Sequence, residues 1–166
     1  MTTADDTGTL APPVSSRDHA EGSADVPVTL VEYGDYECPH CGRAYPIVKA
    51  VQRRLGPQLR FVFRNFPLRS VHPHAEHAAE ASEAAAAQGH FWEMHDALFE
   101  HQAALGDDDL PRYAEAIGLD RARIDRLEGT EYYSADAELL PDLETHDERE
   151  LDVLGRSVIT QFEQYV

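Results

Sequence analysis

The sequence of 166 residues contains no long apolar run, little positive charge and only two cysteines. A helix that crosses a membrane needs about 20 consecutive apolar residues, and no run approaches that length. The first part of the chain also lacks the apolar centre of a signal peptide. These absences predict a chain without a membrane span, which we expect in the cytoplasm.

Positive charge is scarce. The 14 lysine and arginine side chains are outnumbered by 31 aspartate and glutamate side chains, and the formal net charge is −17. A surface of this sign repels the phosphates of nucleic acids and of anionic lipids. Nucleic acids and anionic membrane surfaces are therefore not expected partners.

The only two cysteines, Cys38 and Cys41, are the ends of one Cys-Pro-His-Cys motif. Structural disulfides are rare in the cytoplasm, which favours a redox-active or metal-bound pair. At the start of a helix, two side chains with this CXXC spacing lie on one face and within disulfide reach. The pair is therefore the leading candidate for a functional site.

The motif lies within a predicted strand–helix–strand sequence. The β-forming residues 28–33 predict a strand, which we expect to be buried and central because its apolar run is nearly unbroken. An apolar stripe predicts a helix over residues 41–55, and alternation predicts a second strand over residues 59–66. This βαβ order places the cysteines at the carboxyl end of the first strand, where open α/β sheets usually have their sites.

Single residues refine this unit. Pro46 falls inside the predicted helix and should kink it or loosen its first turn. Gly56, followed by Pro57, should end the helix. Arg60 and Arg64 alternate with apolar residues and should lie on the opposite face of the second strand from them.

The remaining chain divides by composition. Residues 1–25 are small, polar and acidic, which predicts a disordered arm, and residues 26–166 are expected to form one domain. Within this domain, residues 26–68 form the redox unit and residues 130–166 form a weakly helical end segment. Between these lies a helical block, residues 72–129, with glycine stops. Its predicted helices cover residues 74–88, 91–105, 107–117 and 120–128.

Cysteine chemistry predicts different tasks for the two thiols. The attacking thiol needs a lowered pKa, and Cys38 lies at the helix start, where free N–H groups favour negative charge. Pro39 fixes the backbone there, and a protonated His40 would add positive charge. Cys41 lies one turn on and can attack a mixed disulfide at Cys38 to release the product.

Two acidic residues flank the motif. Asp35 and Glu37 are candidate proton relays to Cys41 if they are buried, although partial exposure is the expected state. Two alternatives to redox chemistry remain open. One is a zinc-binding module that combines the cysteines with the histidines of residues 72–77. The other is a non-catalytic binding module.

Longer segments carry a family resemblance. VTLVEYGDYECPHCGRAYPIVKAV, LRFVFRNFPL and VHPHAEHAAEASEAAAAQGHFWEMHDALFEHQ resemble the DsbA-like thioredoxin-fold family of thiol–disulfide oxidoreductases. The likeness is greatest to prokaryotic members, some fused to sodium/proton antiporters, that carry VHPHA and FWEMHD motifs. It covers residues 27–127.

The resemblance implies a thioredoxin-like α/β fold, in which a βαβ core carries a helical insertion. It implies thiol–disulfide exchange with protein substrates and a redox partner, without an organic cofactor or metal. It makes Cys38 the attacking thiol and Cys41 the resolving one, with Pro39 and His40 tuning their pKa values.

The chain departs from the family after Gly129. Members continue with a cis-proline segment, a β-hairpin and a final helix, whereas here Pro141 lies in an acidic, helical context and no hairpin is recognisable. Three explanations remain open. The end segment is a frameshifted or truncated substitute, or a true replacement in which residues 157–162 supply an edge strand, or a partner chain supplies the missing sheet.

Overall fold

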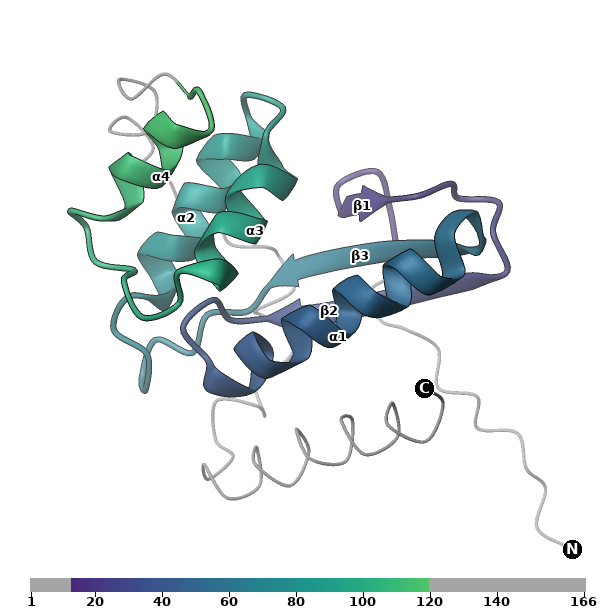
Figure 1. Ribbon diagram of the computed structural model, residues 1–166, viewed down its shortest axis with the longest axis horizontal. Helices are drawn as coiled ribbons and strands as arrows, with labels where there is room; N and C mark the ends of the chain where they lie inside the picture. The colour runs from purple at the N-terminus through teal and green to yellow at the C-terminus, as the bar shows by residue number, and fades with distance from the viewer. Residues whose placement is uncertain (1–12, 120–166) are drawn as a thin grey trace, which may run out of the picture.

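The computed structural model describes residues 13–119, which form a small mixed sheet, one long helix along it and a group of three shorter helices (Figure 1). The strands are β1 (His19–Glu21), β2 (Val28–Gly34) and β3 (Leu59–Asn65). The helices are α1 (Pro39–Leu55), α2 (Ala75–Ala86), α3 (Phe91–Glu100) and α4 (Leu110–Ala116), with a 3-10 turn, η1 (Gly56–Gln58), after α1. No helix in this part of the chain is long and apolar enough to cross a membrane.

The predicted βαβ unit is present. β2 and β3 pair in parallel, from Val28 opposite Leu59 to Gly34 opposite Asn65, and α1 connects them. In the described sheet the order is β1-β3-β2, so the central strand is β3 and not β2. β2 was expected to be central, but β3 takes that place because it pairs with β2 on one side and with β1 on the other. The sequence does not predict β1.

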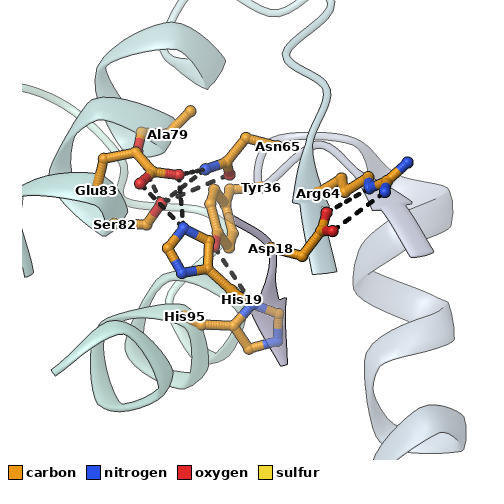
Figure 2. A network of polar contacts seen from close by, with 9 residues as sticks. All are labelled: Asp18, His19, Tyr36, Arg64, Asn65, Ala79, Ser82, Glu83 and His95. Carbon is orange, nitrogen blue, oxygen red and sulfur yellow. Dashed lines mark hydrogen bonds and ion pairs between the residues drawn. The ribbon is translucent and has the colours of Figure 1, made fainter. Parts of the chain in front are cut away.

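β1 corrects the prediction of a disordered arm over residues 1–25. It pairs antiparallel with β3, with His19 opposite Phe63. The imidazole of His19 stacks on Phe91 with ring centroids 3.6 Å apart, and its Nε2 lies 2.9 Å from Oε1 of Glu83 on α2. These contacts join the strand to the helical group (Figure 2). Residues 1–12 lie outside the described residues.

A buried ion pair explains why the polar composition of this segment is misleading. Arg64 donates from Nε to Oδ1 of Asp18 at 2.6 Å, and the Arg64 side chain is only 4% exposed (Figure 2). Arg64 was expected on the face of β3 opposite the apolar residues. Its side chain is instead buried, and its charge is paired with that of Asp18, the residue before β1. A charge buried in this way needs its partner, because removing one partner leaves the other uncompensated.

α1 begins at Pro39, two residues earlier than the apolar stripe predicts, because proline is favoured in the first turn of a helix, where its missing N–H is not needed. The helix continues through Pro46 to Leu55. Gly56 ends it with a φ of 50°, in the left-handed region that favours glycine, as predicted.

The three predicted helices that fall within the described residues are present, each shorter than its predicted range. The three helices pack on one another, and α3 also packs against β3 and α1, where Phe91 meets Phe63 and Phe99 meets Tyr45. His95 of α3 is buried among these side chains, and burial lowers its pKa to about 3. The predicted helix over 120–128 and the segment 130–166 lie outside the described residues.

Candidate active site

The two cysteines lie where the βαβ order predicts, in the connection from the carboxyl end of β2 to the start of α1. Cys38 is the residue that caps the amino-terminal end of α1, and Cys41 lies in the first turn of the helix. Both are free thiols and both are partly buried. The Cys41 side chain packs against the hydrophobic core behind the loop.

The two thiols differ in acidity. A hydrogen bond from Cys41 is the largest influence on Cys38 and lowers its pKa to about 6, and the N–H groups of His40 and Cys41 act in the same direction. The pKa of Cys41 is raised well above its ordinary value by this same contact and by burial. At neutral pH the site therefore holds one thiolate and one thiol, as nucleophilic exchange requires.

His40 contacts both Arg43 and Cys38. Arg43, one turn further along α1, donates from Nη2 to Nδ1 of His40 at 2.8 Å. The backbone N–H of His40 contributes to the lowered pKa of Cys38. The effect of the imidazole side chain on Cys38 stays a prediction.

Asp35 is buried, with 4% of its surface exposed, and not partly exposed as expected. Its Oδ1 accepts the backbone N–H groups of Glu37 at 2.7 Å and Cys38 at 3.2 Å. Its Oδ2 accepts the backbone N–H of Leu68 at 2.8 Å and lies 2.7 Å from Nδ1 of His72. Asp35 therefore ties the cysteine loop to the loop after β3.

Glu37 makes a second tie between the same two loops. Its Oε2 accepts the backbone N–H of His74 at 2.6 Å. Both candidate relay carboxylates are thus engaged in holding loops together. The structure assigns them a positioning task, and their role as proton relays stays a prediction.

The histidines after β3 do not converge on the cysteines. His72 pairs with Asp35, and Nδ1 of His77 lies 2.6 Å from Oδ1 of Asp107 at the surface. Within residues 13–119, no group of three or more histidine, cysteine, aspartate or glutamate side chains is placed to hold a metal ion. The zinc-binding alternative therefore finds no support in the described part of the chain.

Glu32 of β2 influences the site, although the sequence did not single it out. Its side chain is half-buried, desolvation raises the pKa of its carboxyl group to about 7, and its charge makes a minor contribution to the raised pKa of Cys41. A carboxyl group that titrates near neutral pH can exchange a proton with a thiol that it reaches. The signal was present in the sequence as one acidic residue inside an apolar strand.

The chain is similar to known proteins over most of its length. A sequence model of the family described as Thioredoxin matches residues 15–147. The match continues past residue 127, where the resemblance was expected to end, so the departure begins later than predicted.

Two solved structures share the fold. The thioredoxin-like oxidoreductase from Silicibacter pomeroyi DSS-3 is 27% identical with a TM-score of 0.67, over 79% of this chain and 74% of that chain. DsbA2 of Pseudomonas aeruginosa is 28% identical with a TM-score of 0.56, over 76% of this chain and 71% of that chain.

A longer relative is more similar in sequence. The Na(+)/H(+) antiporter NhaA 1 of Mycobacterium sp. (strain KMS) is 52% identical over 119 residues, which are 71% of this chain and 19% of that protein. The chain thus spans about a fifth of the length of this curated relative.

Proposed function

The chain belongs to the thioredoxin family and to its DsbA-like members, and on this premise we propose that it exchanges disulfides with protein thiols through Cys38 and Cys41. The observation that carries the proposal is the placement of two free thiols at the start of α1, Cys38 at its amino-terminal cap and Cys41 in its first turn, which lowers the pKa of Cys38 to about 6 and raises that of Cys41. A module that only binds partners needs no such difference.

In the oxidising direction, the protein starts with a Cys38–Cys41 disulfide. A substrate thiolate attacks the Cys38 sulfur, the Cys38–Cys41 bond breaks, and Cys41 leaves as a thiolate. A second substrate thiolate then attacks the substrate sulfur of the mixed disulfide. This forms the substrate disulfide and releases Cys38 as a thiolate, so the two electrons of the substrate dithiol reside on the protein.

Glu32 supplies the proton that this cycle needs at Cys41. In its neutral form the carboxylic acid protonates the departing Cys41 thiolate, because the raised pKa of Cys41 makes the thiol the favoured form. In the reverse direction, the Glu32 carboxylate takes that proton back as Cys41 attacks the mixed disulfide at Cys38. We assign Glu32 the relay role for which the sequence nominated Asp35 and Glu37.

The acidity of Cys38 also sets the direction of exchange. A stabilised thiolate stabilises the reduced protein, so the disulfide form gives up its bond readily. Pro39, by fixing the helix start, and His40, by its backbone N–H, contribute to this stabilisation. The protein then works as an oxidant, which requires a redox partner that accepts its electrons and restores the disulfide.

Equilibration of the purified protein with mixtures of reduced and oxidised glutathione tests this proposal. We expect a reduction potential between those of thioredoxin, about −270 mV, and DsbA, about −120 mV, because the pKa of Cys38 lies in the range between theirs. The fraction of alkylated dithiol at each ratio, read by mass spectrometry, gives the value. A potential at or below that of thioredoxin would contradict the oxidising role.

A further inference from the structure

A side chain from the helical group also reaches the cysteine loop. Gln102 follows α3, and its Nε2 donates hydrogen bonds to the backbone oxygens of Tyr36 and Cys38, both at 2.8 Å. A single amide group thus holds two carbonyl groups of the loop on either side of Glu37. The hydrogen bonds connect residues that are 66 and 64 positions apart in the chain.

Gly42, in the first turn of α1, makes room for this contact. A Cβ atom placed on Gly42 would lie 2.1 Å from Oε1 and 2.7 Å from Cδ of Gln102. Atoms at these distances overlap, so with any larger residue at position 42 the amide group of Gln102 would have to move away. The absence of a side chain at Gly42 is therefore a condition of the Gln102 contact.

The backbone of Cys38 is held on both sides. Its N–H is accepted by Oδ1 of Asp35 at 3.2 Å, and its carbonyl oxygen receives the N–H of Gly42 at 3.0 Å as well as the Gln102 amide. The Gly42 bond is the first of α1, so Gln102 braces the point at which the helix begins. The N–H groups that lower the pKa of Cys38 come from this first turn, at His40 and Cys41.

We infer that Gln102 is a positioning residue through which the helical group sets the reactivity of Cys38, by fixing the start of α1 against the cysteine loop. The inference rests on the proposed function, since it concerns the same thiol. Gln102 touches neither the reacting sulfur atoms nor a substrate. Its effect is instead to keep the helix N–H groups aimed at the sulfur.

The first test replaces Gln102 with methionine, which keeps the length of the side chain and removes the donor. We expect the pKa of Cys38 to rise by about half a unit to one unit, because a hydrogen bond that positions the site contributes on this scale. The thiolate fraction below the pKa then falls about threefold to tenfold. The equilibrium constant for oxidation of glutathione by the protein falls by a similar factor. Thiolate absorbance across pH gives the pKa, and thermal unfolding shows whether the variant is folded.

The second test displaces Gln102 without changing it. Gly42→Ala pushes the amide group away and should raise the pKa of Cys38 by about as much as Gln102→Met, since both variants lose the same two hydrogen bonds. The double variant should shift the pKa of Cys38 by no more than either single one, because the two hydrogen bonds that Gly42→Ala disrupts are already absent in Gln102→Met. This pair also keeps the inference testable if Gln102→Met alone does not fold.

Gln52→Met is the matched control. Gln52 lies near the other end of α1 and donates from Nε2 to Oε2 of Glu21 at 2.9 Å, so its loss removes a comparable link far from the cysteines. The control should keep the wild-type pKa of Cys38. An unchanged or lowered pKa in Gln102→Met or in Gly42→Ala would overturn the inference, and so would additive effects in the double variant. A wild-type protein that does not exchange with glutathione would instead overturn the proposed function.

Discussion

Replacement of Cys38 with serine should reduce the rate of disulfide exchange with a reduced model peptide by on the order of a thousandfold or more, because an alcohol at this position is not ionised and cannot form the mixed disulfide. Replacement of Cys41 with serine should also prevent oxidation of the reduced peptide, because no Cys38–Cys41 disulfide can form, and with a disulfide substrate it should stop the reaction after the first step. The Cys38 thiolate still attacks a substrate disulfide, but no resolving thiolate follows.

The pKa of Cys38 in two variants of Cys41 further distinguishes the tasks of the two cysteines. In Cys41→Ser a hydroxyl group can still donate to the Cys38 sulfur, whereas in Cys41→Ala the largest influence on its pKa is removed. We expect the pKa of Cys38 to rise more in the alanine variant. Mass spectrometry of the trapped mixed disulfide and alkylation across pH measure the two effects. Retained exchange in Cys38→Ser, or a mixed disulfide on Cys41 in the wild-type protein, would refute the assignment.

Replacement of Glu32 with glutamine should change how stability depends on pH. Burial raises the pKa of Glu32 from 4.5 to about 7 in the folded protein, so the folded state binds a proton that the unfolded state has already lost. The contribution of this group to stability is present below pH 4.5 and is lost as the pH rises to 7. A glutamine has no charge to bury, and we expect its advantage over glutamate to grow by about 3 kcal/mol between pH 4 and pH 8.

Urea unfolding of the oxidised protein measures this difference, since a disulfide removes the titration of the two thiols. Glu93→Gln is the matched control, because Glu93 lies on α3 with an exposed side chain and should show the same difference from the wild type at both pH values. If Glu32→Gln gave a constant difference in the free energy of unfolding, Glu32 would not be a buried group with a raised pKa. Its role as the proton relay would then be lost as well.

The sequence predicted those strands and helices whose formation depends mainly on neighbouring residues. The β-forming run, the apolar stripe and the glycine stops located β2, β3 and the helices because they depend on neighbouring residues. β1 escaped prediction because its stability depends on distant partners. From the sequence alone, Asp18 and His19 are expected to be solvated polar residues. In the structure, Asp18 pairs with Arg64, and His19 contacts Glu83 and Phe91.

The site shows the same division. Cys38 and Cys41 were found because their spacing and their place before a helix are visible in the sequence. The loop contacts of Asp35 and the hydrogen bonds of Gln102 depend on how separate segments meet. Gln102 gave no signal of its own, since a glutamine at helical spacing reads as an ordinary surface residue.

The family match reaches residue 147, and the three explanations for the end segment concern residues outside those described. The proposed chemistry does not depend on a choice among them, because the thiol pair, Glu32 and the loop contacts all lie within residues 13–119.

The most direct test of the central claim is the rate of Cys38 alkylation by iodoacetamide across pH 4 to 9, with the modified residue identified by peptide mass spectrometry. The rate follows the thiolate fraction. We predict a titration with a midpoint near 6, carried by Cys38 while Cys41 stays unmodified at neutral pH. A midpoint above about 8, as for a free thiol, or equal labelling of both cysteines, would contradict the claim.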